Sequence, residues 1–472
     1  MSFFSLAFPL FFLAVFIAHW SLRRWRTLDQ LVLLSASYGF YASWNPPFVL
    51  LLFLFSSLMV FVASRLRTAP APVRRSWMLL ALVAAVGNLG FFRYYEFFRV
   101  GMEALLSPFF SVVALPAVDV ALPVGISFFT LQGLTYVFAV ERQQLKGRYN
   151  PLEVLLFIAF FPTLLSGPIS RATGLLPQIH AGGFSRLIEG ERALILLLSG
   201  LLKKVVISSY LAMALVDPVF NNPDEASGAL AWLALYGYAL QIYCDFSGYT
   251  DLATGIALLL GFRLPRNFDR PYMAENLREF WRRWHISLSS WIRDYLYVPL
   301  GGSRHGLVMT CRNLFFVMMV SGLWHGPRLS FMVWGAWHGA GMVGVTLWKR
   351  WQLRWGLSWP DPRLGHVLAV FLTFHFVALG WVFFRAPGLG EALAVFQALG
   401  RDVSFASLSP LAVGVVAGGL ALHQAGPALL QSLARLLQVC PLWVRPWVLG
   451  AGAYLFLQMG PDGVPAFIYY QF

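Results

Sequence analysis

The sequence predicts an all-α, polytopic integral membrane protein with about eleven to thirteen transmembrane helices, at about 20 residues per crossing. Hydrophobic residues make up 58% of the 472-residue chain and charged residues only 12%. A soluble core cannot bury that much apolar surface, and a mean hydropathy of +0.66 is typical of a chain that lies in a bilayer. Apolar runs of spanning length recur along the whole sequence, which indicates many crossings rather than one anchor.

Each predicted helix corresponds to an apolar run. The run at 30–64 is long enough for two crossings, and Asn45-Pro46-Pro47 divides it because proline cannot donate a backbone hydrogen bond inside a helix. The run at 228–262 also exceeds one crossing. The other runs lie, in chain order, at 3–20, 77–98, 120–140, 152–170, 193–216, 313–348, 365–385, 408–424 and 443–460.

A polar stretch from Tyr243 to Asp251 lies inside the run at 228–262 and predicts an interruption between two helices. It contains two carboxylates, Asp245 and Asp251. A buried carboxylate usually pairs with a cation, and arginines at 263–283 are candidates for that pairing. We therefore expect a structural role for both aspartates, while Asp245 also remains a candidate for contact with a substrate.

Residues 1–472 are expected to form one membrane-embedded domain. The longest polar stretches, 217–228 and 263–283, are too short for a separate soluble domain, and no low-complexity linker or solenoid repeat interrupts the chain. The protein is therefore predicted to be a multi-pass membrane protein.

Charge and cysteine usage predict neither a nucleic-acid partner nor a metal site. A formal net charge of +14 would suggest nucleic-acid binding in a soluble protein, but these arginines lie at the edges of apolar runs. Contact with membrane lipids and the positive-inside rule explain that placement. Cys244, Cys311 and Cys440 are scattered without the spacing of metal ligands or a disulfide framework, so no bound cofactor is predicted.

The strongest catalytic candidate is His325, in the segment Ser-Gly-Leu-Trp-His-Gly. It lies eleven residues after Leu314, where its apolar run begins. At 1.5 Å per residue this is about 16 Å, near the middle of a hydrocarbon layer about 30 Å thick. Gly326-Pro327 should break the helix there, and broken backbone at that depth must line a cavity. The alternative is a packing histidine bonded to a neighbouring helix, but ionisable groups inside a membrane are usually functional.

A second histidine, His285, lies in a segment that combines tryptophans with arginines. Apolar residues from Leu277 to Tyr295 alternate at spacings of four and three, which predicts an amphipathic helix lying at the membrane interface. Arg278 and Arg282 lie on the same face as His285, and together with Arg283 and Arg293 they give this helix a cationic edge. Two explanations remain open: the arginines anchor the helix to anionic lipid headgroups, or they also bind a phosphorylated substrate.

Several segments together resemble the membrane-bound O-acyltransferase family, in particular its bacterial branch that serves polysaccharide O-acetylation and teichoic acid D-alanylation. The resemblance covers about residues 1–390 and the last few residues. The segments that carry it are VGISFFTLQGLTYV at 124–137, FFPTLLSGPISR at 160–171, YCDFSGYTDLATGIALLLGF at 243–262, WRRWHISLSSWIRDYLYVPLGG at 281–302, SGLWHG at 321–326 and the terminal FIYYQF.

The resemblance implies a ring of tilted helices around a central tunnel, with a cytoplasmic opening for an acyl thioester and an opposite opening for the acceptor. The family's near-invariant histidine corresponds to His325, and its second, more variable histidine to His285. The arginine-asparagine pair that precedes the catalytic helix corresponds to Arg312 and Asn313. Trp324, next to His325, is a further candidate for substrate contact.

The function expected on this basis is transfer of an acetyl group across the bacterial inner membrane for O-acetylation of an exopolysaccharide of the alginate or cellulose type. Acetyl-CoA would dock near Arg282 and Arg283, and His325 would act as general base, with His285 and Asn313 orienting the thioester or stabilising the oxyanion. A periplasmic or membrane-anchored acetyltransferase would be the partner that modifies the polymer. The alternatives are D-alanyl or lipid O-acyl transfer and, from another class, a transporter whose histidine relays protons.

Overall fold

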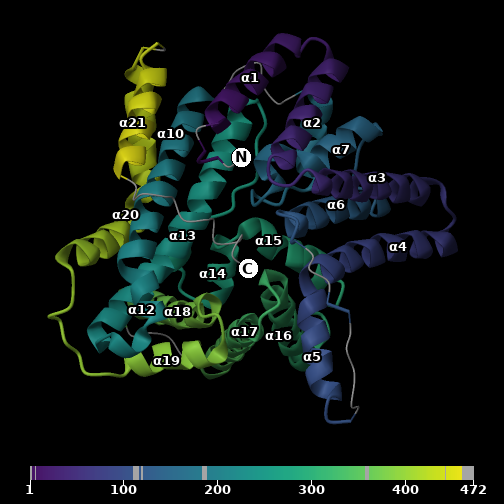
Figure 1. The fold of residues 1–472 in the computed structure, drawn as a ribbon. Helices are drawn as coiled ribbons and strands as arrows, with labels where there is room; N and C mark the ends of the chain where they lie inside the picture. The colour runs from purple at the N-terminus through teal and green to yellow at the C-terminus, as the bar shows by residue number, and fades with distance from the viewer. Residues whose placement is uncertain are drawn as a thin grey trace. The chain divides into compact units, whose positions relative to one another are not determined.

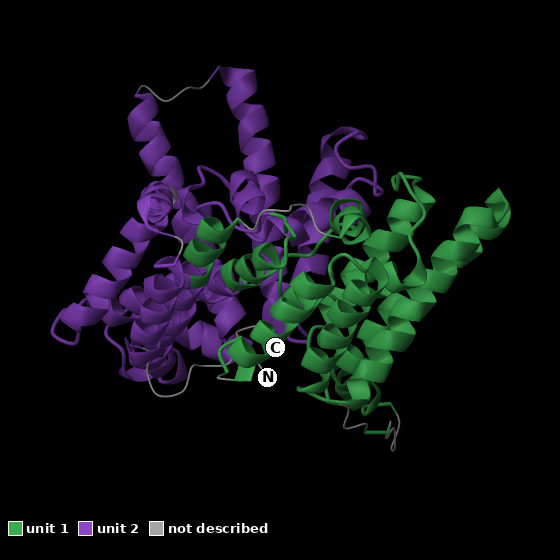
Figure 2. Cartoon of the chain, turned by 90° about the horizontal axis from the view of Figure 1, so that it is seen from above, with its two compact units in different colours: residues 1–197, 250–265 green, residues 198–249, 266–472 purple. Residues whose placement is uncertain are grey.

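The computed structural model confirms the predicted all-α class. It describes residues 3–5, 7–109, 116–117, 121–182, 189–356, 361–441 and 443–459. Within these ranges the regular structure is helical throughout and no β-strand occurs (Figure 1). The chain divides into two compact units, residues Met1–Leu197 with Thr250–Pro265 and residues Leu198–Tyr249 with Arg266–Phe472 (Figure 2).

Unit 1 is built from the N-terminal helices. The turn between its second and third helices lies where the sequence predicts it, because α2 ends at Ala42 and α3 begins at Pro47, on either side of the predicted Asn-Pro break. The helices are α1 (Ala7–Leu22), α2 (Arg26–Ala42), α3 (Pro47–Thr68), α4 (Ala71–Leu89), η1 (Gly90–Tyr94), α5 (Tyr95–Leu106), α6 (Ile126–Glu141), α7 (Pro151–Ala159), α8 (Phe161–Leu164) and α9 (Ala172–Ala181).

The core of unit 1 combines phenylalanine rings with a buried contact between a histidine and an aspartate. The rings of Phe40 and Phe161 lie 5.8 Å apart, and both side chains are fully buried. Nδ1 of His19 lies 2.5 Å from the carboxylate of Asp29, and its Nε2 lies 3.0 Å from the backbone carbonyl of Leu260. This histidine therefore joins α1 both to α2 and to the segment that follows α13.

Unit 2 contains the remaining helices and every candidate site residue. Helices α10 (Gly190–Leu201) and α13 (Gly228–Leu259) are divided between the units. The others are η2 (Leu202–Ser208), α11 (Ser209–Leu211), η3 (Ala212–Val216), α12 (Asp217–Asn221), η4 (Pro223–Glu225), η5 (Pro271–Met273), α14 (Leu277–Arg283), α15 (Ile286–Ile292), η6 (Arg293–Tyr297), α16 (Gly306–His325), α17 (Leu329–Trp355), α18 (Pro362–Arg385), α19 (Leu389–Leu399), α20 (Pro410–Val439) and α21 (Arg445–Met459).

Helices α16 and α17 form a hairpin whose backbones touch. The predicted break at Gly326-Pro327 is confirmed, because α16 ends at His325 and α17 begins at Leu329. A Cβ placed on Gly335 would lie 2.6 Å from the carbonyl oxygen of Met318, so no larger residue fits at that position without moving a helix. Small residues at such crossings let membrane helices approach closely.

Five helical segments of the described chain are long and apolar enough to cross a membrane, or six if the bent pair in α20 is one span. The sequence predicts about eleven to thirteen crossings at about 20 residues each. The difference arises because several apolar runs form shorter helices: α1 and α6 have 16 residues each, about 24 Å, and the run at 152–170 divides between α7 and α8. The five segments are Pro47–Thr68, Ala71–Leu106, Gly190–Asn221, Gly306–His325 and Pro362–Arg385.

The predicted interruption at Tyr243 to Asp251 is wrong. Helix α13 runs through this stretch without a break and is 32 residues long. The predicted pairing of Asp245 with an arginine at 263–283 is also wrong, because its carboxylate forms an ion pair with Lys204 of η2 and lies 3.4 Å from the hydroxyl of Ser208. Both members of the pair are buried, so the polar stretch is satisfied by a neighbouring helix and the backbone need not break.

The buried pair should make a large contribution to folding stability. Replacing Lys204 with Met leaves the Asp245 carboxylate buried without its cation, which is expected to cost about 3–5 kcal/mol. The double variant Lys204→Met with Asp245→Leu should recover most of that loss, and Lys203→Met is the matched control. Thermal unfolding of the detergent-purified protein measures this, and a single variant as stable as the wild type would contradict it.

Candidate functional site

His325 is the last residue of α16 and lies in an aromatic surrounding. Its side chain is buried, and its ring lies 5.1 Å from the ring of Trp334 and 5.0 Å from that of Phe384. Because α16 begins at Gly306, His325 lies at the end of a 20-residue helix, about 30 Å long, rather than midway along one. Its depth in a bilayer remains a prediction.

The segment around His285 is not the continuous amphipathic helix that the sequence predicts. Helix α14 ends at Arg283 and α15 begins at Ile286. His285 itself has φ 42° and ψ 53°, in the left-handed region. This conformation costs a residue with a side chain on the order of 1 kcal/mol, and such residues cluster at functional sites when the surrounding contacts hold them.

Asn267 supplies the contacts that hold this turn. Its backbone carbonyl accepts a hydrogen bond from the Ile286 N–H at 2.9 Å. Its side-chain oxygen accepts from the N–H and the hydroxyl of Ser287 and lies 3.2 Å from Nδ1 of His285. Because an amide oxygen only accepts, this contact is a hydrogen bond in the tautomer that carries the proton on Nδ1, which leaves the lone pair on Nε2.

Trp324 brings the two histidines together. Its ring lies 5.1 Å from the ring of His325, its neighbour on α16, and 6.1 Å from the ring of His285. The other side of His285 packs against Phe246 of α13 at 4.6 Å. Three of the predicted site residues therefore lie together in unit 2, with both histidines buried and Trp324 half-buried between them.

A pocket of about 370 Å³ lies beside this place and carries three arginines, Arg278, Arg282 and Arg293. None of the described residues that line it is acidic. The guanidinium of Arg278 donates to the Thr346 hydroxyl at 2.7 Å, and Arg293 pairs with Asp294. Arg282 is exposed, and its guanidinium makes no hydrogen bond or ion pair with the described part of the chain. This pocket has the charge and the donors to bind an anion such as a phosphate.

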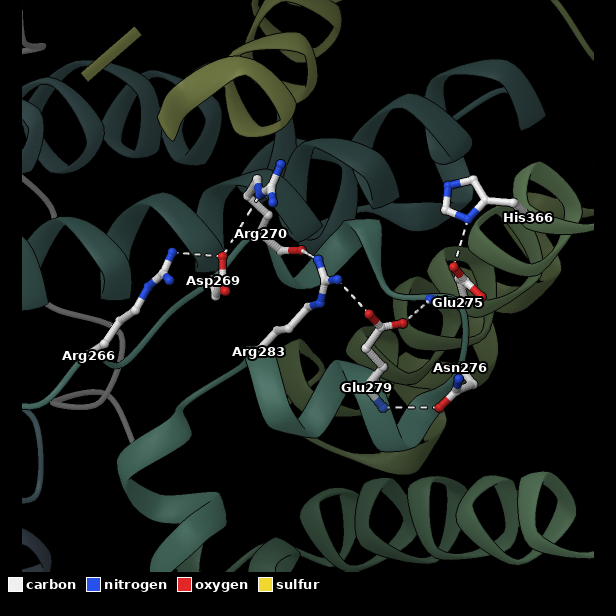
Figure 3. Close-up of polar contacts among 8 residues, drawn as sticks. All are labelled: Arg266, Asp269, Arg270, Glu275, Asn276, Glu279, Arg283 and His366. Atoms are coloured by element: carbon white, nitrogen blue, oxygen red, sulfur yellow. Dashed lines mark hydrogen bonds and ion pairs between the residues drawn. The ribbon is translucent and has the colours of Figure 1, made fainter. Parts of the chain in front are cut away.

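Arg283 does not belong to the pocket. Its guanidinium is 2.5 Å from the carboxylate of Glu279, one turn earlier on α14, and also donates to the backbone carbonyl of Arg270 (Figure 3). The same Glu279 carboxylate accepts from the backbone N–H of Glu275, whose side chain contacts His366. The structure therefore separates the two arginines that the sequence places together: Arg282 faces the pocket and Arg283 stabilises the start of α14.

Asn313 is not brought to His325. The two residues are twelve positions apart on α16, about 18 Å along its axis. The side-chain amide of Asn313 donates to the backbone carbonyls of Leu300 and Gly302, and its oxygen accepts from Arg312 at 2.9 Å. Asn313 therefore holds the loop that precedes α16, and the expected oxyanion role does not fit this position.

Asn267 is the residue of this region that the sequence does not reveal, because nothing in its spacing marks a partner for His285. Arg278 and Arg293 belong to the predicted cationic edge, and both line the pocket. Arg293 begins the π-helix η6, and π-helical turns often occur at functional sites although no sequence pattern predicts them. Asp245, paired with Lys204, joins α13 to η2.

The sequence of this chain is similar to proteins of a known family. Residues 124–357, which include both histidines and the arginine pocket, match the model of MBOAT, the membrane-bound O-acyltransferase family. The chain is 38% identical over 410 residues to a probable alginate O-acetylase of Pseudomonas aeruginosa, covering 84% of this chain and 75% of that protein. It is 36% identical over 397 residues to a peptidoglycan O-acetyltransferase of Helicobacter pylori, covering 78% and 73%.

A more distant relative is a teichoic acid D-alanyltransferase of Bacillus subtilis, 30% identical over 277 residues, which are 55% of this chain and 68% of that protein. The terminal FIYYQF, which also suggested the resemblance, lies outside the described residues. The match over the histidine segments and the similarity over most of the chain lead to one conclusion: this multi-pass membrane protein is an O-acyltransferase of the membrane-bound O-acyltransferase family.

Proposed function

We propose that this enzyme moves an acetyl group from cytoplasmic acetyl-CoA across the bacterial inner membrane, for O-acetylation of an extracytoplasmic polysaccharide. The observation that carries the proposal is the meeting of His285 and His325 at Trp324, beside a pocket with three arginines. An acyl thioester on a phosphorylated carrier suits this arrangement, because its acyl group can react beside the histidines while its phosphates bind the arginines.

His325 is proposed as the general base. It takes the proton of an acceptor hydroxyl while the hydroxyl oxygen attacks the thioester carbonyl, and the carbon–sulfur bond then breaks. The departing thiolate takes up the proton, which leaves an ester and a free thiol. A positioned base of this kind contributes on the order of 10² to 10⁴ in rate. His285, with Nδ1 directed at Asn267, is proposed to place its other nitrogen toward the reacting group.

The arginine pocket is proposed as the site of the donor's phosphates. Arg282 lacks an internal partner in the described chain, so a phosphate would not have to displace a carboxylate from it. Trp281 lines the same pocket and packs on Trp334, whose ring in turn contacts His325. The rings of Trp281 and Trp334 thus connect the pocket with His325. We propose that the acyl end of a donor whose phosphates bind in the pocket extends along these rings to the base.

The acceptor is proposed to be a polysaccharide reached through a partner protein. The relatives are described as acting on alginate and on peptidoglycan, both of which are polymers that carry hydroxyl groups. The polar stretches of this chain are short, as the sequence shows, and offer little surface for a polymer. A periplasmic or membrane-anchored acetyltransferase is therefore proposed to receive the acetyl group and to transfer it to the polymer.

Two other acyl transfers compete with this proposal. Similarity to the teichoic acid D-alanyltransferase keeps D-alanyl transfer open, since both reactions start from a thioester. Lipid acylation would require an acceptor that enters from the bilayer. The identity of the transferred group and of the acceptor distinguishes all three, so the experiment below uses labelled acetyl-CoA and analyses lipid as well as protein.

Proteoliposomes supplied with labelled acetyl-CoA on the cytoplasmic face should deliver label to an acceptor protein on the opposite face. They should modify free polymer poorly without that protein. Replacing His325 with Ala should abolish transfer, while His305→Ala, at an exposed histidine of the same unit, should leave it unchanged. Label found only in lipid would favour lipid acylation, and full transfer by His325→Ala would exclude the histidine as base.

Substitutions of Arg282 and Arg283 should have different effects on the KM for acetyl-CoA. Arg282→Gln should raise the KM for acetyl-CoA about tenfold, because one charge-assisted hydrogen bond to phosphate is lost. Arg283→Gln should lower the thermal stability through loss of the Glu279 contact and leave that KM nearly unchanged, with Arg304→Gln as the exposed control. Equal KM values for the wild type and Arg282→Gln would assign this arginine to lipid headgroups instead.

Asn267 should act through His285. Asn267→Leu removes the acceptor that orients the imidazole, and we expect kcat to fall by roughly tenfold or more. The double variant Asn267→Leu with His285→Ala should be little worse than His285→Ala alone, because both changes remove the same oriented nitrogen. Multiplicative losses in this cycle would show that the two residues contribute independently.

A further inference from the structure

A third buried histidine, His338, lies outside the site described so far. It occupies the second Trp-His-Gly of the sequence, on α17, and its side chain has no exposed surface. Neither of its ring nitrogens makes a hydrogen bond with any residue that the structure describes. A neutral imidazole has one N–H donor and one acceptor nitrogen, and burying both without partners is costly. The ring therefore needs a partner that the described part of the chain does not supply.

Two tryptophans that face His338 share this property. The ring of Trp334 lies 4.8 Å and that of Trp281 5.2 Å from the His338 ring, and the two indoles lie 5.7 Å from each other. The buried indole N–H groups of both have no hydrogen-bond partner in the described chain. We call these three rings the aromatic triad. It gathers three unsatisfied N–H donors and one acceptor nitrogen in one small volume.

The walls around the triad are apolar. The rings of Phe280 and Phe376 lie 6.2 Å and 5.9 Å from that of His338. On the α18 side the chain presents Gly380, where an added Cβ would lie 3.2 Å from the histidine Nε2, so no side chain reaches that nitrogen from this position. A ligand that fits must therefore combine methylene groups with a few hydrogen-bonding groups.

The position of the triad identifies which ligand this is. Trp281 forms part of the wall of the arginine pocket, and Trp334 contacts His325 at 5.1 Å. The triad therefore lies between the pocket proposed for the phosphates and the proposed base. The part of a CoA thioester between its phosphates and its acyl group is a flexible, largely aliphatic chain that carries a hydroxyl group and two amides and ends at the thioester sulfur. Its amides offer both a carbonyl acceptor and an N–H donor, which matches the imidazole and the indoles.

We propose that His338, together with Trp281 and Trp334, binds the pantetheine arm of the acyl donor. The indole N–H groups and the imidazole N–H donate to carbonyl oxygens of the arm, and the second imidazole nitrogen accepts from an amide N–H. This proposal rests on the proposed use of acetyl-CoA and assigns a separate part of that molecule to separate residues. An ordered water is the other source of a hydrogen-bonding partner, and it predicts no effect of the triad on donor binding.

The test compares CoA with pantetheine, which has the same arm but lacks the nucleotide and all phosphates. Equilibrium dissociation constants are measured for the purified protein and for His338→Phe, which keeps an aromatic ring but removes both nitrogens. His338→Gln retains a donor and an acceptor and is the rescue variant. Arg282→Gln is the matched variant at the pocket. Thermal stability of each variant without ligand, and kcat/KM with acetyl-CoA, are recorded in parallel.

We expect His338→Phe to weaken binding of CoA and of pantetheine by the same factor, about tenfold or more, because both hydrogen bonds of the imidazole are lost. His338→Gln should restore most of the affinity. Arg282→Gln should weaken CoA binding and leave pantetheine binding unchanged. This crossed pattern would not arise from a structural defect, which would affect both ligands in both variants.

Wild-type affinity for both ligands in His338→Phe, with unchanged kcat/KM, would overturn the triad as a binding site and leave the proposed function standing. Binding of CoA and pantetheine that depends on His338, without any acetyl transfer by the wild type, would refute acetyl transfer and leave the triad assignment standing. Absence of both binding and transfer would overturn both proposals.

Discussion

The site depends on the hydrogen bonds that Asn267 makes to the turn at Ile286 and Ser287. Without these hydrogen bonds nothing would offset the free-energy cost of the left-handed conformation at His285, and we expect that α14 would continue into α15 as one helix. Because the turn is held, α14 directs Arg278 and Arg282 to the pocket while α15 starts in a new direction, and the His285 ring reaches Trp324. One asparagine thus connects the position of a histidine to the position of a cationic pocket.

Features that are encoded locally could be predicted from the sequence. The all-helical class follows from composition, and the break after His325 follows from Gly326-Pro327, since proline acts on its own neighbours. Features that depend on distant residues could not. The turn at His285 is stabilised by Asn267, eighteen positions earlier, whereas the residues of the turn have a perfect helical spacing of apolar side chains. Conversely, Asp245 suggested a break in α13, but Lys204, 41 positions away, satisfies its charge and the helix continues.

The arginines show why side-chain roles are harder to predict than elements. Arg282 and Arg283 are adjacent, and as neighbours on a helix they point about 100° apart. Arg283 has Glu279 one turn before it, which satisfies its charge, whereas Arg282 has no such partner and remains at the pocket. Two residues of the same type in one motif therefore differ in what they can do. The two Trp-His-Gly motifs show the opposite case, in which residues that are apart in the sequence come together. Because the chain turns back after Pro327, His325 and His338 both contact the ring of Trp334.

The contact of α16 with α17 at Gly335 also limits how this part of the molecule can adapt during turnover. Backbones that touch without intervening side chains cannot slide past each other, so the hairpin that carries His325, Trp334 and His338 behaves as one rigid block. Trp281, on the separate helix α14, packs its ring on Trp334 and His338 of this hairpin. Under the proposed function, a donor that approaches His325 would therefore meet a surface of fixed shape on the α16–α17 side.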